Sequence, residues 1–202
     1  MRKLNLLPAL FTICSVAASA QTSVKFFAPL KVSSPKAYDL PASKVDFDAF
    51  DSLAKEVKAY RKNRLAGLEE FLCMSKEKNT IILDTRSTEM YNRKHVQGAV
   101  HLDFSDFTQA NLAAVIPNTN TRILIYCNNN FDNDEIYFVT KSIQPPRLSK
   151  PSVFQKKEIT LALNIPTFIN LYGYGYKNVY ELRDLVSVFL GGIQFEGTDV
   201  PK

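Results

Sequence analysis

Short apolar segments that alternate with helical patterns most constrain how this chain folds. The runs at 80–83, 98–102, 122–126 and 178–182 are four or five residues long and rich in branched aliphatic side chains. Such runs are typical of strands that are buried on both faces of a parallel sheet. Because helical patterns separate them, the order of elements predicts an α/β fold, an open parallel sheet flanked by helices.

The helices are expected where apolar residues recur every three or four positions. The first pattern, from Phe47 to Leu65, predicts an N-terminal amphipathic helix over 46–66. In a second, short helix over 68–76, Cys73 adjoins the apolar face, and we expect it to be a small buried residue. Further helical segments are expected at 88–95, from Ser105 or Asp106 to 115, and around Pro166. The alternation over 159–165 favours a strand and leaves a helix open as the alternative, and an edge strand is expected around 193–195.

The first 20 residues have the three parts of a secretory signal peptide. Arg2 and Lys3 form a positive start, a mainly apolar stretch follows over 4–16, and residues 18–20 (A-S-A) supply a cleavage site. We therefore expect cleavage after Ala20 and a periplasmic or secreted protein. Residues 21–45, which contain three prolines, are expected to form an extended lead-in.

The composition excludes several classes of protein. With 7 Gly and 10 Pro, the chain is neither a collagen nor a low-complexity sequence. No segment has the ~18 consecutive apolar residues of a membrane-spanning helix, so we expect no membrane insertion after signal cleavage. The net charge of +5 includes the two positive residues of the signal peptide, and the remainder does not indicate a nucleic-acid partner.

Cys127 is the first candidate for chemistry. It follows the apolar run R-I-L-I-Y at 122–126 and opens a polar loop, N-N-N, at 128–130. In an open parallel sheet, reactive groups gather beyond the carboxyl ends of the strands, where loop N–H groups stabilise a thiolate and an anionic substrate. On these residues alone, a nucleophile and a structural thiol are equally supported. A disulfide between Cys73 and Cys127 also stays open, because sequence does not give their separation.

A second pattern lies between Ile81 and Leu102. An apolar strand ends in D-x-R, and an acidic residue and then H-V-Q-G-A follow. These positions are Asp84, Arg86, Glu89, His95, Val96, Gly98 and Ala99. Together with the strand-end Cys127 and a later G-Y-x-x-V-x-x-L segment at 175–182, the pattern resembles the rhodanese-like (sulfurtransferase) homology domain. The resemblance covers about 68–182.

The resemblance implies an exported sulfurtransferase whose rhodanese-like domain spans 67–202. The Cys127 thiolate would take the sulfane sulfur of a small donor as a persulfide and pass it to a thiol or protein acceptor. Loop amides and the N-terminus of the next helix would hold the charge, without a cofactor. His95 would be a structural partner near a strand end. Asp84 and Arg86 would be supporting residues, more simply explained as a buried ion pair than as substrate ligands.

The loop after Cys127 departs from the pattern of the family. That pattern resembles C-x-x-G-x-R followed at once by a helix, whereas this loop reads C-N-N-N-F-D-N-D and has neither Gly nor Arg. We interpret residues 131–158 as an insertion between the loop and its helix. The residues then expected to bind an anion are Asn128, Asn129, Asn130 and Asn164. High activity with thiosulfate, a dianion, is not expected, and the alternative is a catalytically inactive module that binds a protein partner or a small anion.

Other chemistries lack their residues. Asn133 stands six positions after Cys127, where phosphatases of related folds carry the Arg that binds phosphoryl oxygens. The chain has no zinc-ligand spacing of Cys and His and no Gly-rich phosphate loop. We therefore expect neither phosphatase activity nor a bound metal or cofactor.

Overall fold

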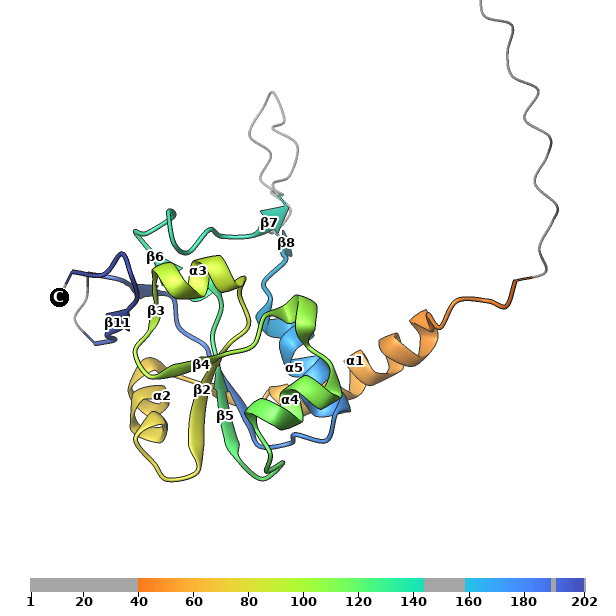
Figure 1. Cartoon of the computed structure of the whole chain (residues 1–202). Coiled ribbons are helices and arrows are strands. Elements are labelled where there is room, and N and C mark those ends of the chain that lie inside the picture. Colours follow the sequence, from red (N-terminus) through yellow and green to blue (C-terminus); the bar gives the residue numbers. More distant parts are fainter. Residues whose placement is uncertain (1–39, 144–158, 190–191, 202) are drawn as a thin grey trace, which may run out of the picture. The chain divides into compact units, whose positions relative to one another are not determined.

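The computed structural model describes residues 40–143, 159–189 and 192–201 (Figure 1). The chain divides into two compact units, Met1–Lys44 and Val45–Lys202. Only residues 40–44 of the first unit are described, and their side chains are exposed. The predicted signal peptide (1–20), most of the predicted lead-in (21–45) and residues 144–158 of the predicted insertion therefore lie outside the described residues.

A five-stranded sheet forms the centre of the unit 45–202, and every neighbouring pair in it is parallel. Its spatial order is β1-β9-β5-β2-β4. The strands are β1 (Leu65–Ala66), β2 (Thr80–Asp84), β4 (Ala99–His101), β5 (Arg122–Ile125) and β9 (Val179–Leu182). The last four coincide with the apolar runs of the sequence, so the predicted parallel α/β sheet is confirmed.

The first strand, β1, was not predicted. The sequence pattern extends the N-terminal helix through Leu65, but the helix ends at Arg61. The main chain that follows the helix pairs with β9 instead. The carbonyl groups of Arg64 and Ala66 accept hydrogen bonds from the N–H groups of Glu181 and Arg183. Pairing with β9 therefore overrides the helical spacing of the side chains.

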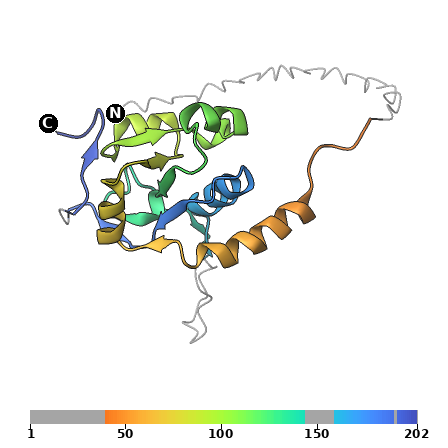
Figure 2. The ribbon, with the colours of Figure 1, turned by 90° about the horizontal axis from the view of Figure 1, so that it is seen from below.

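The strands present alternate side chains to two separate cores, one on each face of the sheet. Leu83, Ile123 and Ile125 face the first core, whereas Ile82 and Leu124 face the second. The first core is closed by α1 (Phe47–Arg61), α4 (Gln109–Val115) and α5 (Asn164–Gly173), and the second by α2 (Leu68–Ser75). Figure 2 shows α2 on one side of the sheet and α1 and α5 on the other.

Two predicted boundaries were wrong. The helix expected from Ser105 or Asp106 is a short η1 turn (Phe104–Asp106), followed by α4, whose cap is the Thr108 hydroxyl accepting from the N–H of Asn111. The alternation over 159–165 gives a strand only at β8 (Ile159–Thr160), because α5 already begins at Asn164. In the remaining helix, α3 (Thr88–Arg93), the side chain of Ser87 caps the first turn.

The start of the predicted insertion is part of the fold. Three two-stranded pairings lie outside the main sheet, namely β6 (Phe131–Asp132) with β10 (Val186–Ser187), β3 (His95–Val96) with β11 (Phe195–Glu196), and β7 (Ser142–Ile143) with β8. Phe131 and Phe138 are buried in the second core, with ring centroids 4.4 Å apart, and both contact the ring of Phe195. Residues 131–138 thus contribute to the core instead of forming an appended loop.

Within the described residues, no helix combines the length and the apolar character that crossing a membrane requires.

Truncating Phe138 to Ala should destabilise the protein by about 3–5 kcal/mol, because it removes a buried ring and leaves a cavity in the second core. Urea unfolding followed by circular dichroism measures this loss. Val139→Ala is the matched control, since Val139 is the next residue and 51% exposed. Equal unfolding midpoints for the two variants would contradict the placement of this segment in the core.

Candidate active site

Cys127 lies between the end of β5 and the short helix η2 (Asn128–Asn130). Its Sγ accepts a hydrogen bond from the main-chain N–H of Leu163, with N and Sγ 3.2 Å apart, whereas the main-chain N–H of Asn130 donates to the carbonyl of Cys127 at 3.0 Å. These donors come from different segments, because Leu163 stands immediately before α5. The residue is only 1% exposed, so the sulfur lies beneath the surface.

Of the four residues predicted to bind an anion, two meet beside Cys127. The Oδ1 of Asn130 accepts from the N–H of Cys127 at 2.9 Å and from the Nδ2 of Asn164 at 3.0 Å. The Nδ2 of Asn130 donates to the carbonyl of Leu182 at 2.7 Å. Through these contacts the side chain of Asn130 links the Cys127 loop to the end of β9.

The other two have different surroundings. Asn129 exchanges a pair of hydrogen bonds with the main chain of Lys141, at 3.1 and 3.2 Å, so its side chain holds the segment that leads into β7. Asn128 is buried, and among the described residues its Oδ1 has no hydrogen-bond partner; the same is true of the Oδ1 of Asn164. A carboxamide oxygen only accepts hydrogen bonds, so neither oxygen can hold an anion.

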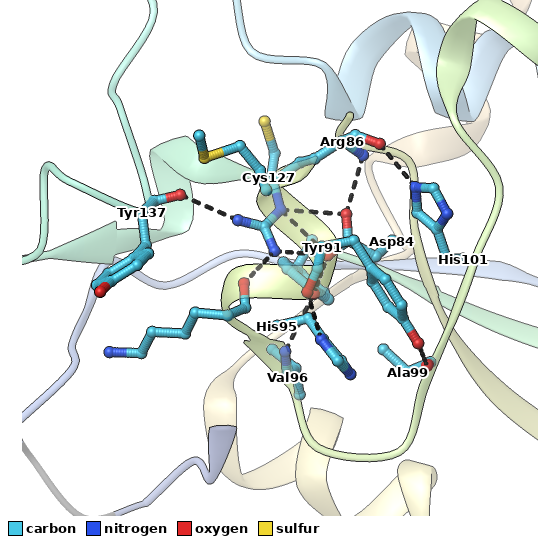
Figure 3. A network of polar contacts seen from close by, with 12 residues as sticks. Asp84, Arg86, Tyr91, His95, Val96, Ala99, His101, Cys127 and Tyr137 are labelled. Carbon is cyan, nitrogen blue, oxygen red and sulfur yellow. Dashed lines mark hydrogen bonds and ion pairs between the residues drawn. The ribbon is translucent and has the colours of Figure 1, made fainter. Parts of the chain in front are cut away.

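Asp84 is the centre of the buried polar network beside Cys127 (Figure 3). Its carboxylate accepts hydrogen bonds from the Nε and Nη2 of Arg86, at 3.1 and 2.7 Å, and from the hydroxyl of Tyr126. The Arg86 guanidinium also donates to the carbonyls of Lys94 and Tyr137, at 2.7 and 3.1 Å. The side chains of Asp84 and Arg86 are 0% and 3% exposed, so the expected buried ion pair is present.

The network fixes the protonation of its members. Burial alone would lower the pKa of Arg86, but its hydrogen bond with Asp84 and the charge of that carboxylate outweigh burial and raise the pKa above its ordinary value. Burial and then the negative charge of Asp84 raise the pKa of Tyr126 well above its usual range. Tyr126 is therefore a neutral donor, and its oxygen in turn accepts from the N–H of Val96. The partners of the Arg86 guanidinium are Asp84 and the carbonyls of Lys94 and Tyr137, whereas the donor at the Cys127 sulfur is the main-chain N–H of Leu163.

His95 has a structural position, between α3 and β11. Its Nδ1 lies 2.6 Å from the carbonyl of Tyr91, and its Nε2 lies 3.2 Å from a carboxylate oxygen of Glu196. The Tyr91 ring stacks on both His95 and His101, with centroids 3.8 and 4.5 Å away. His101 in turn contacts the carbonyl of Arg86 through its Nε2. The two histidines and Tyr91 thus form one packed group, which contacts the Asp84–Arg86 turn through His101.

Sequence reasoning missed Tyr126, Glu181, and the pair formed by Thr85 and Thr167. The two threonine hydroxyls are buried and 2.9 Å apart, and they link the end of β2 to α5. A signal existed for Tyr126, because aligning the two neighbouring strands places it opposite Asp84. A signal existed for Glu181 as well, since a carboxylate within a buried strand requires a partner.

The two cysteines that the structure describes, Cys73 and Cys127, are free, and Cys73 is exposed rather than buried. The core face of α2 carries Phe71 and Met74, three residues apart, which turns the intervening Cys73 to solvent. Among the described residues there is no group of three or more His, Cys, Asp or Glu side chains that could hold a metal ion.

Replacing Arg86 by Met should destabilise the protein by about 3–5 kcal/mol, because the buried Asp84 carboxylate loses its counter-charge. The measurement is urea unfolding at neutral pH. Arg93→Met is the control, since Arg93 pairs with Asp199 at the surface, and its unfolding midpoint should stay close to that of the wild type. A midpoint for Arg86→Met as high as that of the control would show that the ion pair is dispensable.

Comparisons with known proteins agree with this architecture. The family model of the rhodanese-like domain matches residues 68–184. No curated protein matches the chain. Among solved structures, a thiosulfate sulfurtransferase from Pseudomonas aeruginosa is 17% identical over 73% of this chain, with a TM-score of 0.42; the match spans 23% of that protein.

Two further solved structures are similar at the same level. A rhodanese from E. coli is 17% identical over 58% of this chain and 98% of its own, with a TM-score of 0.34. The BH2092 protein from Bacillus halodurans is 13% identical over 74% of this chain and 88% of its own, with a TM-score of 0.42. The family model covers more than half of the 202 residues and the same elements that carry the sequence pattern. The chain therefore belongs to the rhodanese-like domain family, a sulfurtransferase-like family.

Proposed function

We propose that this chain is an exported sulfurtransferase that carries sulfane sulfur as a persulfide on Cys127. The observation that supports this most directly is the hydrogen bond that the main-chain N–H of Leu163 donates to the Cys127 sulfur, at the end of a buried strand. A donor aimed at the reacting atom stabilises the negative charge that a sulfur nucleophile carries. The same donor would help to hold the charge of the persulfide once it has formed.

The chemistry consists of two displacements. The Cys127 thiolate attacks the sulfane sulfur of a donor; a new S–S bond forms, the donor's own bond to that sulfur breaks, and its remainder leaves with the electron pair. A thiolate acceptor then attacks the outer sulfur of the persulfide, which transfers that sulfur and returns Cys127 as a thiolate. No electron acceptor or cofactor is needed, because the sulfur atom moves between thiolate-type leaving groups.

The surroundings of the sulfur favour a donor of low charge. The donor at Sγ is a main-chain amide, the guanidinium of Arg86 is bonded to Asp84 and to main-chain carbonyls, and the unpartnered Oδ1 atoms of Asn128 and Asn164 would repel a dianion. With Cys127 only 1% exposed, a thin, chain-like donor also fits better than a bulky one. The persulfide of a small thiol, whose sulfur atoms carry at most one negative charge, meets both conditions, whereas thiosulfate and inorganic polysulfides, which are dianions, do not meet the first.

Export is proposed on the sequence of residues 1–20, with Gln21 as the first residue of the mature, periplasmic or secreted protein.

One feature favours a second candidate function, that of a catalytically inactive module that binds a protein partner or a small anion. The N–H of Cys127 is bonded to the side chain of Asn130, so the loop satisfies part of its own hydrogen-bonding capacity. Combined with the burial of the sulfur, this gives a loop that is closed without a substrate.

Incubation with the persulfide of a small thiol should add about 32 Da, one sulfur atom, to the peptide that contains Cys127, and a thiol acceptor should remove it. Intact and peptide mass spectrometry measure the gain. Cys127→Ser should lose it, whereas Cys73→Ser, which removes an exposed thiol, should retain it. Thiosulfate should load the wild type at least about tenfold more slowly, equivalent to ~1.4 kcal/mol in the barrier.

Absence of the gain with every donor tested, or an equal gain in Cys127→Ser, would end the sulfurtransferase proposal. If Cys127→Ser then bound sulfite as tightly as the wild type in titration calorimetry, the inactive module would be the better description.

A further inference from the structure

We infer that Arg61, near the end of α1, is a positioning residue for Cys127, acting through the buried side chains of Glu181, Asn164 and Asn130. The catalytic meaning of this inference rests on the proposed function, whereas the chain of contacts does not. Arg61 lies outside the residues that the family model matches, 68–184. The N-terminal helix would thus hold the cysteine loop in place through a residue that is not part of the region matched by the family model, 68–184.

The first link is a two-point ion pair. The Nε and Nη2 of Arg61 each lie 2.5 Å from a different carboxylate oxygen of Glu181. The side chain of Glu181 is only 6% exposed, and that of Arg61 is 29% exposed. Two parallel N–H···O bonds fix the plane of a carboxylate as well as neutralising it. Arg61 therefore sets the direction in which the Oε1 of Glu181 offers its remaining lone pair.

The second link is the side-chain amide of Asn164. Its Nδ2 donates to the Oε1 of Glu181 at 3.1 Å and to the Oδ1 of Asn130 at 3.0 Å. Both partners are acceptors, so the opposite orientation of the amide would place its oxygen against two oxygens. The orientation of Asn164 is fixed for this reason, and the carboxylate of Glu181 is one of the two groups that fix it.

The third link reaches the sulfur. Asn130 is held through its Oδ1 by Asn164 and through its Nδ2 by the carbonyl of Leu182, and its Oδ1 also accepts from the main-chain N–H of Cys127 at 2.9 Å. The N–H that donates to Sγ belongs to Leu163, the residue immediately before Asn164. The contacts that hold the main chain and the sulfur of Cys127 thus come from the Asn130–Asn164 pair or adjoin it, and Arg61 orients that pair through Glu181.

Variants of Arg61 and Glu181 separate positioning from simple stabilisation. In Arg61→Met the buried carboxylate is unpaired, and Asn164 loses its oriented acceptor. In Glu181→Gln the side chain keeps an oxygen for Asn164 and carries no charge that needs Arg61. The double variant Arg61→Met/Glu181→Gln has no unpaired buried charge but still lacks the two-point contact, so it should recover the stability that Arg61→Met loses without recovering the orientation of the cysteine loop. Lys58→Ala is the control, because Lys58 is an exposed cation on the same helix.

The main readout is peptide-level hydrogen exchange in the full chain. In Arg61→Met, exchange in peptides covering 127–131 and 161–165 should rise about tenfold or more relative to the β2 peptide, which reports global opening. The rate of persulfide formation on Cys127 in a single turnover should fall about tenfold. Lys58→Ala should stay within about threefold of the wild type in both measurements, whereas the double variant should stay within about threefold of Arg61→Met.

Unchanged exchange in the two loop peptides of Arg61→Met, or exchange in the double variant as slow as in the wild type, would overturn the inference, because the effect would then be that of an unpaired buried charge alone. Should Arg61→Met not fold, Arg61→Lys carries the same comparison, since it keeps the charge and removes the two-point contact. If the wild type forms no persulfide while the exchange pattern is as expected, the positioning role stands and the sulfurtransferase proposal fails.

Discussion

The buried ion pair between Asp84 and Arg86 is the interaction on which the rest of this structure depends. It lies at the carboxyl end of β2, and its donors and acceptors reach α3 through Lys94, β5 through Tyr126 and the predicted insertion through Tyr137. A carboxylate and a guanidinium that are both this deeply buried are stable only when nearly all of their hydrogen-bonding groups have partners. The segments around the site are therefore held together by polar contacts, in addition to the two apolar cores.

In the cysteine loop, too, buried polar groups are held by hydrogen bonds, but here the groups are neutral amides. The Cys127 sulfur is buried, and its surroundings include amides of Asn130, Asn164 and Leu163, oriented by hydrogen bonds to the end of β9 and to Glu181. A loop with an Arg would hold an anion by charge, whereas this loop offers dipoles. The sulfur itself lies at the end of a buried strand, where the family pattern places it.

Much of the fold followed from patterns that are local in sequence. The apolar runs located β2, β4, β5 and β9, and their short length with intervening helices led to a parallel sheet, because each strand is buried on both faces. Boundaries failed where a partner distant in sequence decided them. Leu65 is in a strand because Glu181 lies beside it, and residues 161–163 are not a strand because α5 begins at Asn164. Cys73 is exposed because the neighbouring Phe71 and Met74 determine how α2 faces the core.

The sequence by itself determined the chemistry that is available: one thiol at a strand end, an acidic and a basic residue in D-x-R, and a loop of asparagines without Gly or Arg. Only the tertiary structure decided which hydrogen-bond partner each of these groups has. Asn129 bonds to Lys141, and Asn130 and Asn164 bond to each other beside Cys127. Glu181 bonds to Arg61. The physical reason is that hydrogen bonds act over about 3 Å, so the partner of a buried polar group is set by which segments the packed sheet and helices bring within that distance.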